Sequence, residues 1–329
     1  MAVSQTINYD SFFTSTTQKF ETELQKNFIA YRPGVNLLMD SYGHKESGGW
    51  AVQTPLEFGN NSTTKFFQPY DQIDTTPSEF ALPGIYQWRQ VGSSATVSEV
   101  EKVANSGKEK LFDLTAGRIR QAVRSMTNLV SSELYSDGTS FGGNTFQGLA
   151  AGISTTPTAD PASGAVGGVS AVTYVWWQNN ATTSAGSFAA NGVKGSSQDL
   201  VFSMFNNCTD GAMDRPTAIL SAQDVFGFYN QTLLSTVRYV DPLQKGDLSF
   251  GGLYYQDMPW YWDRMCPSGR MYMVNTDYVH FYVDPQMMFR WTESRTWPNQ
   301  VVDIRLLLLR LTLCYKDRMF LGVIDGFTA

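Results

Sequence analysis

The sequence predicts an α+β fold in an elongated subunit, and three observations support this prediction. Residues 50–58 and 84–97 alternate between the two faces of a strand, which is typical of the arms of a long hairpin. Residues 96–136 carry one apolar stripe at helical spacing, and an unbroken helix of that length would be about 60 Å long. Residues 301–315 read as one strand, although the mean strand has only about 5–6 residues.

The composition limits the class of protein. The 329 residues are 42% hydrophobic, which excludes wholesale disorder. The formal net charge of −6 is the opposite of the usual balance in a sequence-specific nucleic-acid-binding protein. No apolar run reaches the roughly 18 residues that a membrane-spanning helix needs. The first residues also lack the basic and apolar regions of a secretory signal, so we expect no membrane partner.

The cysteines and histidines give no sign of a metal site. Cys208, Cys266 and Cys314 lie far apart, and we expect three buried, reduced thiols. His280 lies in a strand pattern and is expected to be packed there, whereas His44 is expected in a solvated loop. None of the nucleotide-binding or nucleophile motifs is present, so we expect no cofactor.

Residues 1–46 are predicted to form an arm that lies on another surface. An apolar residue recurs every fourth position across residues 17–30, which predicts a short helix, and Pro33 is expected to end it. Such a narrow apolar face does not hold a helix together by itself in water. The arm therefore needs a partner.

Residues 47–95 are predicted to form a hairpin that also needs a surface to lie on. Its connection, 59–83, is polar and is broken by prolines. A two-stranded ribbon alone is marginally stable in water. Thr96 and Glu99 have the spacing of a capping box, which predicts that the long helix begins there and ends at Gly138. Gly107 and Gly117 weaken this helix, so a kink or a start nearer residue 108 is the alternative.

The rest of the chain predicts shorter elements. Residues 138–196 are rich in small residues, with one candidate strand at 174–177. Ser197 is expected to cap a helix, and Ser221 with Asp224 has the spacing of a second capping box. The other predicted strands are 217–220, 253–255, 259–263, 271–274 and, after the strand at 301–315, a return strand at 319–324.

Two carboxylates raise an enzymatic alternative. Asp257 and Asp263 flank the aromatic run 260–262, and paired carboxylates beside an aromatic platform suit a carbohydrate hydrolase. The simpler interpretation, which we favour, places the aromatic residues in an antiparallel sheet and the acids in its turns. The hydrolase hypothesis predicts that Asp257→Asn or Asp263→Asn abolishes activity and leaves assembly intact.

The order of the predicted elements resembles the major capsid protein of tailed bacteriophages. That family has the HK-ninety-seven fold, which herpesvirus shells and bacterial encapsulins share. Its parts are an N-terminal arm, an extended loop, a long spine helix, an α/β axial domain and long terminal strands. The segments that carry the resemblance are 84–88, 146–149, 215–221, 252–263, 269–276 and 298–300.

The resemblance implies an α+β, HK-ninety-seven-like major capsid fold in four parts. Residues 1–46 would be the arm and 47–95 the extended loop. Residues 96–139 and 279–329 would form the peripheral domain with the spine helix, and 140–278 the axial domain. The implied function is not enzymatic: the chain would assemble into the icosahedral or prolate head shell around the double-stranded DNA of a tailed phage. The implied location is the virion, after assembly in the host bacterial cytoplasm.

The resemblance also implies the partners. The first is the chain itself, in hexamers and pentamers, and the others are scaffolding protein, portal and a cement or decoration protein. Packaged DNA would touch the inner face non-specifically, and the acidic net charge suits a wall that does not hold DNA tightly. An encapsulin-like nanocompartment shell, which packages a cargo enzyme, is the alternative with the same fold.

Seven residues are candidates for contacts between subunits, and none is a candidate for catalysis, metal or cofactor binding. Four are large apolar side chains on the ribbon, which need a partner surface if they are exposed: Trp50, Phe58, Tyr86 and Trp88. We therefore expect Trp88→Ala to impair shell formation more than folding of the monomer.

The other three candidates are charged. Some members of the family weld the shell through an isopeptide bond from an extended-loop lysine, and Lys65 near the ribbon tip is the lysine to test for this role. The sequence shows no matching asparagine or activating glutamate, and a plain charged tip is the simpler interpretation. Arg118 and Arg124 recur on the long helix, either as a solvated face or as interface charges.

Overall fold

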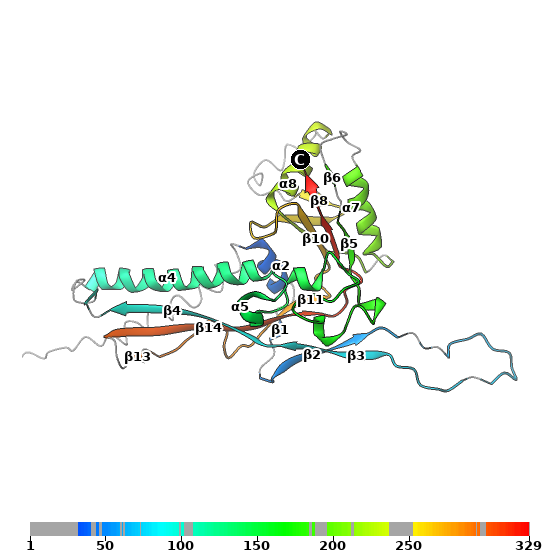
Figure 1. The fold of residues 1–329 in the computed structure, drawn as a ribbon, viewed down its shortest axis with the longest axis horizontal. Coiled ribbons are helices and arrows are strands. Elements are labelled where there is room, and N and C mark those ends of the chain that lie inside the picture. The colour runs from blue at the N-terminus through cyan, green and yellow to red at the C-terminus, as the bar shows by residue number, and fades with distance from the viewer. Residues whose placement is uncertain are drawn as a thin grey trace, which may run out of the picture.

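The subunit has a long, flat lower part and an upright second part, as the computed structural model shows (Figure 1). A hairpin projects from the lower part well beyond the rest of the molecule. The predicted helix at 17–30 lies outside the described residues. The structure describes residues 32–40, 44–45, 48–59, 61, 63–72, 74–98, 100–101, 108–183, 186–187, 196–211, 214–236, 253–293, 295–296 and 301–328.

The lower part is a sheet built on β14 (Val302–Tyr315), which confirms the long predicted strand. One edge of β14 pairs with β4 (Arg89–Ser98) along the whole of β4, from Arg89 opposite Leu311 to Ser98 opposite Val302. These two strands form the long rib of the subunit (Figure 1). The remaining strands of this sheet are β11 (Val279–Val283), β12 (Arg290–Trp291), β13 (Arg295–Thr296) and β1 (His44–Lys45).

Helix α4 (Lys108–Glu133) runs along β4, and its start at Lys108 confirms the later of the two starts that the sequence left open. Thr96 is not a cap, because it pairs with Ile304 inside β4. Glu101 accepts a hydrogen bond from the Ser98 N–H at 3.2 Å, so the reciprocal contact of a capping box lies two residues further on. The 26 residues of α4 span about 39 Å. Its buried apolar stripe consists of Ile119, Ala122, Val123, Met126 and Val130.

The projecting hairpin is made of β2 (Ala51–Glu57) and β3 (Ala81–Gln87), which pair antiparallel. The prediction of a single second arm at 84–97 is wrong. The strand breaks at Trp88, where the chain leaves β2 and continues as β4 along β14. The physical reason is the long apolar strand β14, which offers β4 a complete row of backbone partners. Nothing in the local sequence 84–97 marks this change of partner.

The upright part holds a second six-stranded sheet between helices α7 (Ser196–Asn207) and α8 (Gln223–Thr236) (Figure 1). Its strand at Gly322–Asp325, β15, was predicted as a return strand from β14. It instead pairs with two strands of the second sheet, so the chain crosses from one sheet to the other after Tyr315. The order of the sheet is β5 (Asn180–Thr182), β15, β10 (Arg270–Val274), β7 (Ala218–Ser221), β9 (Met258–Trp262) and β8 (Leu253–Tyr255).

The second capping box is not formed. Ser221 is buried in β7, and its hydroxyl accepts a hydrogen bond from the Trp260 indole at 2.7 Å. Asp224 binds the turn before β10 instead, where its carboxylate accepts hydrogen bonds from Ser268 and Gly269. Ser221 therefore bonds to a side chain of the neighbouring strand, and its hydroxyl does not cap the helix N-terminus.

Helix α2 (Pro33–Asp40) begins at Pro33, and proline suits the first helical position because its missing N–H is not needed there. The helix that Pro33 was expected to end lies outside the described residues. Two further local predictions are wrong. Residues Val175–Trp177 form a 3₁₀ turn, η2, and not a strand. His44 pairs with Tyr282 in the parallel bridge of β1 with β11 and is not in a loop. The remaining short elements are α5 (Ser140–Gly143), α6 (Leu149–Gly152), η1 (Val166–Gly168), β6 (Gly186–Ser187) and β16 (Phe327–Thr328).

Arg318 joins the two parts of the subunit. Its side chain is fully buried. The guanidinium donates to the Gly152 carbonyl at 2.7 Å and to the Asn179 amide oxygen at 3.1 Å. It also lies 5.8 Å from the ring centre of Trp177. A buried charge is stable only when it is well hydrogen-bonded, so these contacts fix the turn between β14 and β15.

Candidate inter-subunit surface and hairpin cavity

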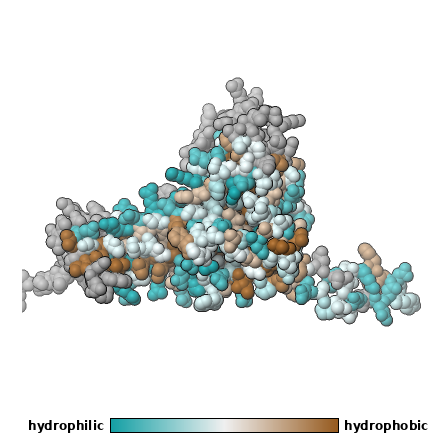
Figure 2. Space-filling view, in the orientation of Figure 1, coloured by the Kyte–Doolittle hydropathy of each residue, from teal (hydrophilic) through white to brown (hydrophobic). Residues whose placement is uncertain are grey.

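The loop between β2 and β3 carries the most exposed aromatic side chains on the subunit's projecting end. Figure 2 shows this loop, residues 58–80, standing clear of the body. Phe66 and Tyr70 are completely exposed, and Phe67 and Phe80 are more than half exposed. Large apolar groups in such numbers on one extended loop are typical of an interaction surface. The sequence does not single out these residues as contacts, because the connection between the strand arms is polar overall.

Trp50 and Phe58 lie at the two ends of β2. Trp50 is 89% exposed at the start of the strand. Phe58 is half-buried, because its ring stacks on Trp176 with centroids 4.5 Å apart and an interplanar angle of 7°. Trp50 therefore keeps its apolar surface available, whereas Phe58 uses part of its surface to hold the loop base against η2.

The expectation that Tyr86 and Trp88 present free apolar surface is wrong. Both rings are buried inside the subunit. The Tyr86 hydroxyl donates to the Tyr315 carbonyl at 2.7 Å, and burial raises the pKa of Tyr86 well above its ordinary value. The Arg310 guanidinium lies 5.0 Å from the centre of the Trp88 ring. Both side chains anchor the base of the hairpin to β14 rather than reaching a neighbour.

Gly167 explains how Tyr86 comes so close to η1. A methyl group at Gly167 would lie 2.7 Å from the Tyr86 hydroxyl oxygen, and the φ of Gly167 is +63°. Both observations require glycine at this position. The hairpin base is therefore clamped between η1 on one side and β14 on the other.

The three charged candidates occupy different parts of the surface. Lys65 is exposed, and its ammonium donates to the Gln72 carbonyl at 2.7 Å within the same loop. Arg118 is paired with Glu101 at 3.1 Å, and exposed pairs of this kind contribute only about 0–1 kcal/mol. Arg124 lies on the exposed face of α4. The structure does not bring these residues together.

The loop 58–80 is acidic. It carries three carboxylates and one ammonium group: Asp71, Asp74, Glu79 and Lys65. Asp74 is fully exposed, and hydrogen bonds from the Thr76 hydroxyl and N–H lower its pKa. Asp71 accepts a hydrogen bond from the Gln68 N–H at 3.0 Å. The exposed aromatic groups and the acidic groups therefore share one loop.

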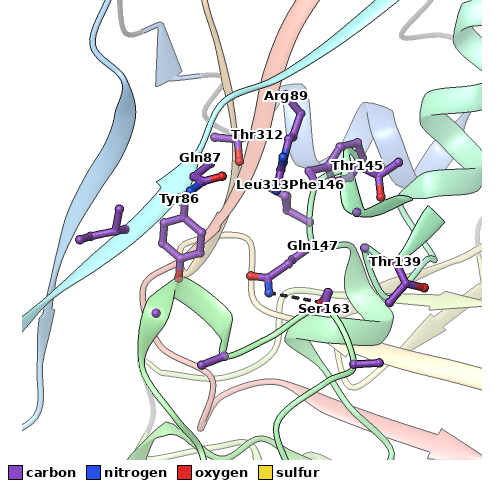
Figure 3. Close-up of a pocket in the computed structure, with 16 residues that line it drawn as sticks. Tyr86, Gln87, Arg89, Thr139, Thr145, Phe146, Gln147, Ser163, Thr312 and Leu313 are labelled. Carbon is purple, nitrogen blue, oxygen red and sulfur yellow. Dashed lines mark hydrogen bonds between the residues drawn. The ribbon is translucent and has the colours of Figure 1, made fainter. Parts of the chain in front are cut away.

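A cavity of about 610 Å³ lies at the base of the same hairpin (Figure 3). Phe146 and Leu313 supply buried apolar walls. Gln147 joins two of the loops around the cavity, because its amide donates to Ser163 at 3.3 Å and to the Gly164 carbonyl at 3.0 Å. Arg89 is the charged residue in the described lining. We refer to this space as the hairpin cavity.

The two carboxylates of the hydrolase alternative are too far apart to act together. Asp257 lies in the turn before β9 with a φ of +64°, and Asp263 follows the end of β9. Six residue steps along a strand separate them by about 20 Å, whereas paired glycosidase carboxylates lie about 5–9.5 Å apart. Asp263 is also buried and accepts a hydrogen bond from the Met265 N–H. The hydrolase alternative is therefore wrong.

In the described part of the chain, neither a membrane-spanning helix nor a metal site is found. No helix there is long and apolar enough to cross a membrane. No cluster of three or more His, Cys, Asp or Glu side chains there has the geometry of a metal site. The three cysteines are buried and not disulfide-bonded, as predicted.

The fold is shared with solved capsid structures. The cyanophage A-1(L) capsid matches with a TM-score of 0.60 at 17% identity, over 90% of this chain and 93% of that chain. The capsid of phage XM1, a myovirus, matches with a TM-score of 0.57 at 8% identity, over 88% and 92%. The SrpI encapsulin of Synechococcus elongatus matches with a TM-score of 0.52 at 12% identity, over 88% and 86%. No protein-family model and no curated protein sequence matches the chain.

These matches show that the chain has the α+β, HK-ninety-seven-like fold that its sequence resembles. The match to the cyanophage capsid covers nearly the whole length of both chains.

Proposed function

We propose that this chain is a major capsid protein, which self-assembles into the head shell of a tailed phage around double-stranded DNA. The observation that carries the proposal is the shared fold with phage capsids over 90% of this chain. The projecting loop supports it, because four strongly exposed aromatic side chains there would be buried by a neighbouring copy. The role is structural, and it needs no catalytic residue.

The proposed assembly follows from the shape of the subunit. The hairpin and its loop reach away from the body, so their contacts fall on a different surface of the next copy. Such a head-to-tail contact closes into a ring when a whole number of equal rotations from one copy to the next adds up to a full turn. Rings of six and five copies are the hexamers and pentamers that an icosahedral or prolate shell contains.

We propose the domain roles that the resemblance implies. Residues 1–46 act as the arm, and 47–95 act as the extended loop. Residues 96–139 and 279–329 form the peripheral domain, and 140–278 form the axial domain around the ring centres. One strand, β15 (Gly322–Asp325), lies with the axial sheet, so the two domains share their last connection.

The remaining partners are part of the same proposal. The inner wall would touch packaged DNA non-specifically, and the net charge of −6 would keep that contact weak. Scaffolding protein, portal and a cement or decoration protein would join the shell during assembly. The protein would then be located in the virion, after assembly in the host cytoplasm.

An encapsulin-like nanocompartment is the second candidate, because the SrpI encapsulin has the same fold. The two candidates differ in their contents. A phage shell would hold nuclease-protected DNA when it is isolated from infected cells, whereas a nanocompartment would hold a cargo protein.

The first experiment is to express the full chain alone, separate it by size exclusion and image it by negative-stain electron microscopy. Closed shells, or flat rings of five and six subunits, are the expected result. A 36.7 kDa monomer that does not assemble even when a phage scaffolding protein is co-expressed would contradict the proposal.

A further inference from the structure

We infer that the hairpin cavity of one copy binds the acidic tip of the hairpin loop of a second copy. The acidic tip is Tyr70, Asp71 and Asp74. The inference rests on the proposed function, because it needs copies of the chain side by side. It adds to that function a specific receiving site for the loop, with an arginine and a carboxylate as the recognition pair.

The first observation is an arginine without a counter-ion at the cavity. Arg89 is half-buried at the start of β4, and it alone among the described lining residues is charged. In the described part of the chain, no hydrogen bond or ion pair engages its guanidinium. A partly desolvated guanidinium is stabilised by a carboxylate, which accepts two of its hydrogen bonds in parallel. The cavity therefore favours an anionic occupant.

The second observation is the shape and chemistry of the walls. Hydroxyl groups of Thr139, Thr145 and Thr312 line the cavity around its apolar walls, Phe146 and Leu313 (Figure 3). The bonds of Gln147 to Ser163 and Gly164 tie its own loop to the one facing loop before anything binds. The accessible lining is mixed, with polar groups as well as apolar ones, and it fits a tyrosine ring with its hydroxyl next to an acidic side chain.

The acidic tip has that combination. Tyr70 is completely exposed, and Asp71 follows it directly in the chain. Asp74 is fully exposed three residues later. The tip is thus an aromatic group beside two carboxylates, presented at the far end of an extended loop (Figure 1).

A subunit cannot fill its own cavity with its own tip. The cavity lies beside Gln87 at the end of β3, and the six steps from Gln87 back to Ala81 extend about 20 Å. The loop continues beyond Ala81 away from the body (Figure 1). The tip that enters the cavity must come from another copy, which gives the head-to-tail contact that rings require.

The exposed face of α4 is the competing site for the acidic tip. Arg124 lies on that face and is open to solvent. Water and salt screen a charge pair on an open helix surface, so such a pair adds little to binding. The hairpin cavity excludes part of that water, which is the reason for preferring Arg89.

The direct test uses a fluorescent peptide of residues 66–78 and the unassembled full chain. Fluorescence anisotropy should show saturable binding to the wild type, about 10-fold weaker binding to Arg89→Gln, and unchanged binding to Arg124→Gln. A peptide with Asp71→Asn and Asp74→Asn should lose binding to a similar extent. No binding to the wild type, equal binding to Arg89→Gln, or a loss with Arg124→Gln alone would overturn the inference.

A charge exchange tests the contact in the assembly. Arg89→Glu alone and Asp71→Lys with Asp74→Lys alone should each reduce shell yield, and the chain that carries all three changes should recover it. Circular dichroism of each variant checks that the subunit is folded. If the wild type forms shells and the combined variant shows no recovery, the inference fails and the proposed function stands. If the wild type does not assemble even with a co-expressed phage scaffolding protein, the proposed function fails, while the peptide experiment still reports on the site.

Discussion

The two tryptophans that flank the hairpin should respond in opposite ways to substitution by alanine. Trp50 is 89% exposed, whereas Trp88 is 9% exposed beneath Arg310. We therefore expect Trp50→Ala to impair assembly without changing subunit stability. We expect Trp88→Ala to destabilise the subunit itself, which reverses the expectation drawn from sequence.

The magnitude follows from the contacts of Trp88. Replacing a buried tryptophan by alanine costs about 3–5 kcal/mol, and the lost contact with Arg310 adds about 0.5–2 kcal/mol. The Trp88 indole N–H has no hydrogen-bond partner in the described structure. Removing this buried, unpaired group raises the unfolding free energy by about 1–2 kcal/mol and so offsets part of the loss. The expected net loss in unfolding free energy is about 3–4 kcal/mol. Trp50→Ala should change it by less than about 0.5 kcal/mol.

The assay is urea unfolding of the unassembled subunit, followed by circular dichroism, with light scattering to follow assembly. Trp88→Phe is the matched control, because it keeps an aromatic ring under Arg310 and removes the unpaired N–H, and it should unfold closer to the wild type than Trp88→Ala does. A Trp88→Ala subunit as stable as the wild type would refute the reasoning. So would a Trp50→Ala subunit that assembles normally.

Three further outcomes follow from buried groups. Gly152→Ala should prevent folding, because the added methyl group would overlap the Tyr315 ring, and insoluble expression compared with soluble Gly117→Ala would show this. Arg318→Leu should lower the unfolding free energy by about 2–4 kcal/mol, because two buried acceptors lose a charged donor, and urea unfolding at pH 7 measures it. Burial raises the pKa of Asp317, with the nearby Asp214 charge acting in the same direction, so the folded state favours its protonated form. The stabilising contribution of Asp317 is therefore greatest below the ordinary pKa of 3.8 and is lost as the pH rises through the raised pKa. The unfolding free energy of Asp317→Asn should rise relative to that of the wild type between pH 4 and pH 7. A difference in unfolding free energy that does not change with pH would contradict this.

The sequence by itself predicted the elements whose patterns are long and local. The strand at 301–315 and the apolar stripe of α4 follow from residue spacing, and the fold family follows from the resemblance of the segment order to a known family. In these segments each residue's face is set by its own periodicity, so no distant contact is needed to read it. The separation of Asp257 and Asp263 into two turns also follows from the strand between them.

Only the tertiary structure decided which surfaces are free. The local sequence pattern predicts that Tyr86 and Trp88 are exposed on the ribbon. In the structure, distant parts of the chain bury both rings, and the local sequence carries no sign of this burial. The same applies to Thr96 and to the break at Trp88, where pairing with β14 overrides the local helix and hairpin signals. The hairpin cavity exists because loops far apart in the chain meet around Arg89. Burial and partner choice are properties of long-range packing, and residue order alone does not determine them.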